Sequence, residues 1–293
     1  AFKGFEDGGA LENLIERLNI PDTPGARLAL QCAIVARDGD AARALALFEV
    51  LKENCNAAGT PGTADSILNG MLTWAAKTGS AAVIDSLLAH HNHPGVELDS
   101  AVRIAIADGH IHCLESLLVV GPSLTKFLEK FSPGAPASSA PLRIILEAVQ
   151  MDDGAALDLM RSRGVRLGPF EGMAQGIQPI DAAARQGSPS AVRAILRDPS
   201  VVQWIMARKS DAIMRACDRG HPESLAALLE RVQLIHTKEN SEVFGNATPL
   251  LQAVSSGSLA TVEIVLAQGV DVNEKVEGKR TPLACAAGLH AID

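Results

Sequence analysis

The sequence predicts an all-α protein, a solenoid of stacked helix–turn–helix units with few or short β-hairpins. The first observation is a glycine that recurs about every 36 residues, at Gly39, Gly79, Gly109, Gly187, Gly220 and Gly257. In two divergent copies Asp152 and His290 take its place, and all of these positions are called turn residues below. The second observation is that apolar residues lie at fixed distances on both sides of the turn residue. A period of about 20 to 50 residues is typical of helical repeat arrays.

The segment before each turn residue predicts an inner helix. In most copies a bulky residue lies seven positions before the turn residue and a small one lies four before it, as in Leu72 and Ala75 or Leu283 and Ala286. Residues three apart share one helix face, and a small residue on that face lets a neighbouring helix approach closely. We therefore expect inner helices that pack tightly against both of their neighbours.

The segment after each turn residue predicts an outer helix. Apolar residues lie five, eight and nine positions after it, as in Ile84, Leu87 and Leu88, which is the stripe of an amphipathic helix. Phe48 and Arg161 replace the last leucine of this stripe in two copies. Between the two helices, the turn glycine supplies the left-handed backbone that other residues adopt only at a cost.

The clearest copy, TPLLQAVSSGSLATVEIVLAQGVDVN at residues 248–273, and its restart TPLACAAG at residues 281–288 resemble the ankyrin repeat. The resemblance is strongest over residues 178–288 and weaker towards the N-terminus. It implies that Thr248 and Thr281 cap inner helices, with a proline in the first turn of each.

Other features qualify the resemblance. His110 and His221 follow their glycines as in the Gly-His pair of that family, but the complete hairpin signal Gly-x-Asp-Val-Asn occurs only at residues 269–273. Armadillo or HEAT helices are the structural alternative, which the repeat length and the TPL start disfavour.

The repeats predict one ankyrin array over residues 1–293, with about eight repeats and the last one incomplete. Residues 1–26 are expected to form an N-terminal half repeat that caps the stack. The eight repeats are then expected at residues 27–66, 67–98, 99–140, 141–177, 178–209, 210–246, 247–279 and 280–293. Because an inner helix without its outer partner is costly at the end of a solenoid, we expect further repeats or another domain after Asp293.

Three insertions interrupt the array. Residues 52–66 are rich in Gly, Ala, Thr and Pro and predict a flexible loop. Residues 121–140 contain Leu124, Phe127, Leu128 and Phe131 at helical spacing, and residues 167–178 contain Phe170 and Met173. Each of the last two insertions either folds onto its own repeat or offers an exposed aromatic anchor to a partner, and the sequence favours the first interpretation.

Composition excludes several classes of function. The chain has 34 acidic and 26 basic residues, a formal net charge of -8 and no block of like charge, so we expect neither nucleic acid nor an anionic membrane surface as a partner. No apolar run is long enough to span a bilayer, so we expect no membrane insertion. Five cysteines without a CxxC pair argue against disulfides and structural zinc, and indicate a reducing compartment, cytoplasmic or nuclear.

Catalytic and metal-binding motifs were also sought. The sequence contains no HExxH, GxSxG or GxGxxG, so we predict no enzyme and no cofactor. The one cluster of titratable residues that resembles a site is His90, His91, His93, His110 and His112. It lacks a cysteine or carboxylate at ligand spacing, so we predict no metal site there.

The ankyrin resemblance implies that a concave face of inner helices and hairpin tips binds another protein. The residues just before each turn residue are the candidates, together with three from the last hairpin: Arg37, Asp38, Lys77, Thr78, Asp108, Gln150, Met151, Arg185, Gln186, Asp218, Arg219, Ser255, Ser256, Lys275, Glu277 and Arg280. These residues mix charges without an aromatic, which predicts a polar groove. We expect a monomeric, non-enzymatic scaffold for a partner protein; the alternative is a substrate-targeting or regulatory segment of a larger enzyme or host-directed effector.

Overall fold

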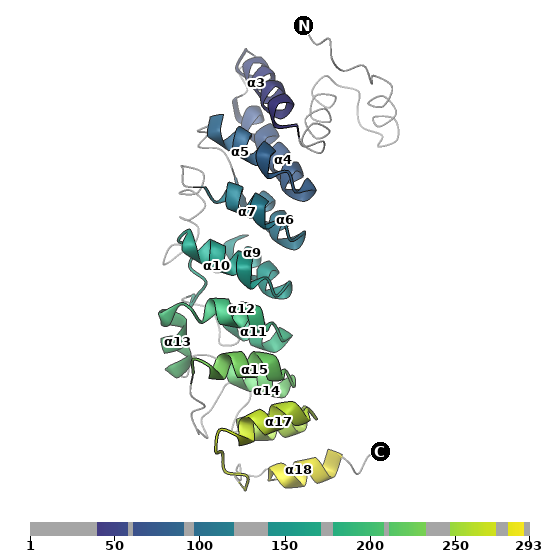
Figure 1. The fold of residues 1–293 in the computed structure, drawn as a ribbon, viewed down its shortest axis with the longest axis vertical. Coiled ribbons are helices and arrows are strands. Elements are labelled where there is room, and N and C mark those ends of the chain that lie inside the picture. Colours follow the sequence, from purple (N-terminus) through teal and green to yellow (C-terminus); the bar gives the residue numbers. More distant parts are fainter. Residues whose placement is uncertain are drawn as a thin grey trace. The chain divides into compact units, whose positions relative to one another are not determined.

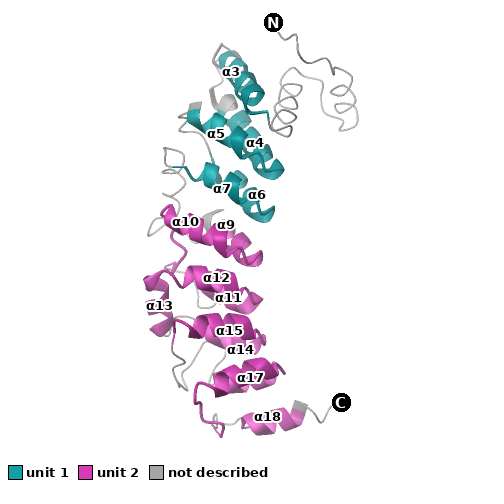
Figure 2. Cartoon of the chain, in the orientation of Figure 1, with its two compact units in different colours: residues 1–129 teal, residues 130–293 magenta. Residues whose placement is uncertain are grey.

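The computed structural model describes residues 40–57, 61–90, 97–119, 140–170, 178–207, 211–232, 247–273 and 281–289. These residues form 15 α-helices and no strand (Figure 1). The chain divides into two compact units, Ala1–Glu129 and Lys130–Asp293 (Figure 2). The division falls inside the predicted insertion at residues 121–140, whose four apolar residues with helical spacing lie outside the described residues.

Unit 1 contains α3 (Ala41–Ala57), α4 (Pro61–Thr78), α5 (Ala81–His90), α6 (Asp99–Ala107) and α7 (Ile111–Leu117). The inner helices α4 and α6 pack on each other, and the outer helices α3, α5 and α7 pack in that order. Its core consists of the apolar residues that the repeat pattern selected, including Leu72, Ile84 and Leu114. Phe48, which departs from the pattern, is also fully buried.

Unit 2 repeats the same arrangement. Its inner helices are α9 (Ala140–Gln150), α11 (Pro179–Gln186), α14 (Ala212–Asp218), α16 (Pro249–Ser255) and α18 (Pro282–Leu289). Its outer helices are α10 (Gly154–Ser162), α12 (Pro189–Ile195), α15 (Pro222–Leu229) and α17 (Leu259–Leu266). Successive inner helices pack on one another, and so do successive outer helices. The all-α repeat fold predicted from the sequence is confirmed.

The turn residues have the predicted left-handed backbone. Gly79, Gly109, Gly187, Gly220 and Gly257 have φ angles between 65° and 77°, and Asp152 has a φ of 49°. In five of these six turns, the N–H of the next residue donates to the carbonyl of the alanine four positions before the turn residue, as in Ser188 N to Ala183 O at 3.0 Å. This bond is the one that closes a Schellman turn and satisfies a carbonyl at the end of the inner helix. Gly39 and His290 lie outside the described residues.

The caps implied by the family resemblance are present. The Thr248 hydroxyl accepts a hydrogen bond from Leu251 N at 3.2 Å, and the Thr281 hydroxyl accepts one from Ala284 N at 3.3 Å. A proline follows each threonine and opens the helix. Each hydroxyl satisfies one of the backbone donors that the first turn leaves without a partner.

The prediction of a loop at residues 52–66 is wrong over most of that range. Helix α3 continues to Ala57, and α4 already begins at Pro61. Lys52, Glu53 and Ala57 are good helix formers, and a proline is tolerated at the first helical position because its missing N–H would have no partner there. The glycine and threonine that follow Pro61 are therefore absorbed into the first turn of a helix of 18 residues.

Two further predictions need correction in unit 2. Leu283 occupies the column of buried bulky residues, yet 76% of its side chain is exposed, because among the described helices α18 packs chiefly on α16. The repeat pattern predicted two helices per repeat, but the segment after α12 forms an extra helix, α13 (Pro199–Met206). Asp198 begins this helix by accepting a hydrogen bond from Ser200 N at 2.9 Å.

Candidate functional site

The predicted partner-binding residues that the structure describes lie at the C-terminal ends of the inner helices. None of their side chains is buried, and the most exposed apolar one is Met151, at 54%. The described members are Lys77, Thr78 and Asp108 in unit 1, and Gln150, Met151, Arg185, Gln186, Asp218, Arg219, Ser255 and Ser256 in unit 2. Arg37, Asp38, Lys275, Glu277 and Arg280 lie outside the described residues.

Two of these residues use their hydroxyl groups within their own turn. The Thr78 hydroxyl lies 3.1 Å from Trp74 O and 3.2 Å from Ala75 O, one helical turn earlier. The Ser256 hydroxyl donates to Ala253 O at 2.8 Å and accepts from Ser258 N at 3.3 Å. Their side chains complete the end of the helix, which leaves the charged and amide residues beside them as the stronger candidates for contacts with a partner.

Sequence reasoning missed an aromatic residue on this surface. Trp74 lies on α4, five positions before the turn glycine, and 43% of its side chain is exposed. The Lys77 ammonium lies 5.5 Å from the centroid of the indole, within cation–π range. The signal was present in the sequence, because the helical register places Trp74 one turn before Thr78. Only the two positions next to each glycine were considered there.

Unit 2 has buried charge on its inner helices. Arg215 of α14 lies five positions before its turn glycine, the position that corresponds to Trp74. Its guanidinium lies 3.9 Å from the carboxylate of Asp211, and these side chains are only 13% and 6% exposed. A charge pair held this far from water is part of the packing of the helices. Among the predicted partner-binding residues of unit 2, the exposed charged side chains are Arg185 and Arg219, in the last turn of α11 and in the turn after α14.

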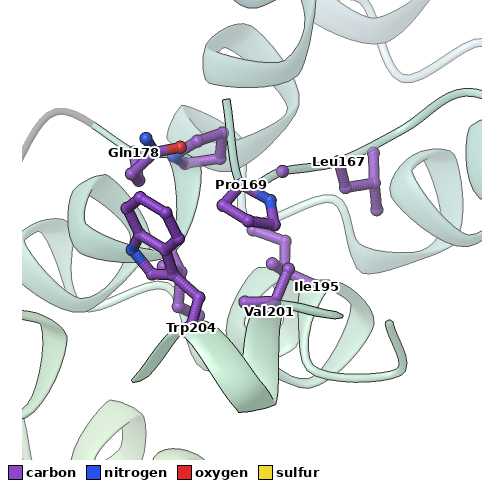
Figure 3. A pocket seen from close by; sticks show the side chains of 9 residues that line it. Leu167, Pro169, Gln178, Ile195, Val201 and Trp204 are labelled. Atoms are coloured by element: carbon purple, nitrogen blue, oxygen red, sulfur yellow. The ribbon is translucent and has the colours of Figure 1, made fainter. Parts of the chain in front are cut away.

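Helix α13 is fixed to the repeat by polar and apolar contacts. The Gln178 side chain accepts from Phe170 N at 2.8 Å and donates to Phe170 O at 2.7 Å, and the Ser200 hydroxyl donates to Gly168 O at 3.4 Å. Trp204 of α13 lines an apolar crevice with Pro169 and neighbouring side chains (Figure 3).

This crevice is too narrow to hold a water molecule. We therefore interpret the region as packing that holds the half-buried Phe170 against its own repeat. Met173 lies outside the described residues.

The comparison with protein families decides between the helical repeats considered for this chain. A family model of ankyrin repeats matches residues 180–276, in three copies. Residues 180–276 are ankyrin repeats. The match begins at α11 and extends past α17, and unit 1 shows the same helix pairs and left-handed turns outside it. A search of curated protein sequences gave no significant match.

Ankyrin repeats are generally protein–protein interaction modules, and the family is typically non-enzymatic.

The turn histidines link one repeat to the previous one. His110 Nδ1 donates to Ala76 O at 2.8 Å, and His221 Nε2 donates to Arg185 O at 3.1 Å. His112 instead contacts Glu115 of its own helix at 3.1 Å. The side chains of His110, His112 and His221 therefore each have a structural contact within the protein.

The thiols of the buried cysteines are unreactive near neutral pH. Burial, together with the Asp218 carboxylate, raises the pKa of the Cys217 thiol to about 12. Burial and the Asp85 carboxylate raise the pKa of the Cys113 thiol to about 11. Both thiols stay protonated near neutral pH, so neither is a nucleophile or a ready metal ligand.

The described residues form neither a metal site nor a membrane-spanning helix. Within the described ranges, no three His, Cys, Asp or Glu side chains are placed to hold a metal ion together. The side chains of His90, His91 and His93 lie outside this description. None of the described helices has the length and apolar character needed to cross a membrane.

Proposed function

We propose that this protein is a non-enzymatic scaffold that binds a partner protein through the exposed ends of its inner helices. The observation that supports this proposal most is Trp74, whose indole is 43% exposed on an inner helix. Tryptophan is among the residues most enriched at the energetic centres of protein interfaces, because it buries a large rigid area at a small entropic cost. Lys77 beside it adds a cation that a partner carboxylate would contact.

The charges on this surface indicate what the partner contributes. In unit 1 the inner helices and their turns present Lys77 and Asp108, and in unit 2 they present Arg185 and Arg219. The candidate residues are therefore mixed in sign, and each unit also exposes an apolar side chain among them, Trp74 in unit 1 and Met151 in unit 2. For unit 1 we infer a partner surface that places an apolar group on Trp74 and a carboxylate beside Lys77. For unit 2 we infer carboxylates that pair with Arg185 and Arg219. This replaces the groove without an aromatic that the sequence predicted.

The test is affinity capture with the whole chain followed by a binding measurement on the purified partner. Trp74→Ala is expected to weaken binding by about 2 kcal/mol, or about 30-fold in Kd, as removal of an aromatic anchor does. Met206→Ala is the matched control, because Met206 is 40% exposed but lies on α13, away from the inner helices.

A double variant, Arg185→Glu with Arg219→Glu, asks whether unit 2 contributes to the same interface. Unchanged binding by Trp74→Ala and by the double variant would contradict the proposal. Equal losses in Trp74→Ala and Met206→Ala would also contradict it, since the inner face would then have no special role.

A further inference from the structure

The outer helices show a change of charge in the middle of unit 2. Six positions after the turn residue, four repeats have an acidic residue: Asp85, Glu115, Asp158 and Glu263. The repeats of α12 and α15 have Arg193 and Ala226 at this position. One turn later on the same face, Arg197 follows α12. Both arginines form ion pairs with neighbouring repeats, Arg193 with Glu230 and Arg197 with Asp158.

An open hollow lies where the charge changes. It is lined by Arg193, Arg197, Ala227, Glu230 and Arg231, and offers about 160 Å³ of free space. Ala227 is fully buried, whereas Leu159 and Ile264 occupy the equivalent position of two other repeats. The small side chain leaves room between the arginines. A water molecule takes roughly 30 Å³ of liquid, so the space suits a group the size of phosphate together with its bridging waters.

The arginines of this hollow are only partly compensated. Arg193 donates from both Nε and Nη2 to Glu230 Oε1 at 3.2 Å, and Arg197 pairs with Asp158 outside the lining. Arg231 makes one long contact, from Nη2 to Leu196 O at 3.5 Å, and has no carboxylate partner among the described residues. The lining has three guanidinium groups and one carboxylate, and the Asp158 carboxylate beside Arg197 offsets a further charge, which leaves the hollow with a formal charge of about one positive.

We propose that this hollow binds the phosphate monoester of a phosphorylated side chain in a partner protein. Such a group has a charge of about −1.5 to −2 at neutral pH and three strong acceptor oxygens, which complements a positively charged lining. Guanidinium groups bind phosphate through two parallel N–H donors, and Arg231, which has no carboxylate partner among the described residues, is the lining residue best placed to use them. The hollow shares no residue with the inner-helix face, so this site is separate from the proposed function.

The observations favour a phosphorylated protein over an anionic bilayer. The chain has a net charge of -8, which opposes approach to a negatively charged surface. A flat bilayer would also meet Asp158 and Glu263, the acidic residues on the outer helices of the neighbouring repeats. A single phosphate group on a peptide is smaller than a bilayer surface and enters the hollow without approaching Glu263.

The test titrates the full chain with a short phosphoserine peptide, its unphosphorylated form and inorganic phosphate, following the Arg Nε–H resonances by NMR. We expect saturable binding of the phosphopeptide only. Arg231→Gln should weaken it about tenfold, as loss of a charged hydrogen bond does. Glu230→Gln should strengthen phosphopeptide binding, because the change frees the Arg193 guanidinium from its ion pair and makes the lining more positive. A structural role alone would not move the two variants in opposite directions.

Arg43→Gln is the matched control, because Arg43 is an exposed arginine of α3 that also pairs with a carboxylate, Asp40. It should bind as the wild type does, and so should Trp74→Ala, which keeps this result separate from a failure of the proposed function. Thermal unfolding of each variant verifies its fold.

Four outcomes would overturn the proposal: no binding of the phosphopeptide, equal binding of its unphosphorylated form, equal binding of inorganic phosphate, or no effect of Arg231→Gln. Binding to phosphatidylserine vesicles that Arg231→Gln abolishes, without peptide binding, would assign the hollow to a membrane and also overturn it.

Discussion

The link between consecutive repeats differs between unit 1 and the start of unit 2. In unit 1, the residue after the turn glycine is His110, whose ring donates to Ala76 O at 2.8 Å in the previous repeat. In unit 2, the same position before α12 holds Ser188, whose hydroxyl donates to Val149 O at 2.9 Å. Both carbonyls lie three positions before the turn residue of the previous repeat. Two different side chains thus satisfy the same carbonyl at the end of an inner helix.

The turn residue changes together with this link. Where the histidine is used, the turn residue of the previous repeat is a glycine and the ring packs against it: a Cβ at Gly187 would lie 2.7 Å from His221 Nδ1. Where the serine is used, the turn residue is Asp152, whose carboxylate accepts from Ala191 N at 2.9 Å in the next repeat. At Gly187 the histidine leaves no room for a Cβ, whereas Ser188 leaves space for the Asp152 side chain, which makes its own bond.

The largest expected effect comes from a methyl group at a turn glycine that has a histidine packed on it. Gly187→Ala places Cβ against the ring of His221 and also forces alanine into left-handed backbone, at φ 77°. We expect a loss of about 3 kcal/mol of unfolding free energy, from backbone strain and the displaced ring together. Urea unfolding followed by circular dichroism measures it.

Gly257→Ala is the matched control for this prediction. Gly257 has a similar φ of 74°, but nothing lies within 4 Å of a Cβ built there. This variant should lose only about 1 kcal/mol, the cost of the backbone alone. Equal losses in the two variants would show that the histidine contact does not constrain the glycine, which breaks the comparison.

A smaller effect is expected from the serine link. Ser188→Ala removes a hydroxyl that is buried and leaves Val149 O without that donor, so we expect a loss of about 1 kcal/mol. Ser190→Ala, an exposed serine in the first turn of the same helix, should change unfolding by less than about 0.5 kcal/mol. If the two variants unfold alike, Ser188 is not a link between repeats.

The sequence predicted the repeating parts of the fold well, because the same pattern of helix and turn residues occurs in each repeat. The turn glycines, the unusual backbone of Asp152 and the caps at Thr248 and Thr281 all follow from local rules of helix termination. The repeat pattern predicted less well the features that occur in only one repeat. The signal for α13 was present at Asp198 and Pro199, a capping residue followed by a helix-starting proline, but the repeat pattern contains only two helices per repeat and predicts no third.

The candidate site was less predictable than the fold. The register correctly placed exposed side chains at Lys77, Arg185 and Arg219, but it did not reveal which of them are used within the turn, as Thr78 and Ser256 are. Exposure of Trp74 depends on how α4 and α6 pack, and a repeat column gives no information about an aromatic that occurs once. The hollow beside Arg231 joins residues of two repeats, so no single repeat predicts it.

Site-specific photo-crosslinking tests most directly whether the partner contacts the inner-helix face. A photoreactive amino acid replaces Trp74 in one variant and Asp85, an exposed residue of the outer helix α5, in the other. Each variant is irradiated with the captured partner, and the crosslinked product is quantified on a denaturing gel. We predict a crosslink from position 74 and none from position 85. A crosslink from position 85 alone would place the partner on the outer helices and contradict the account.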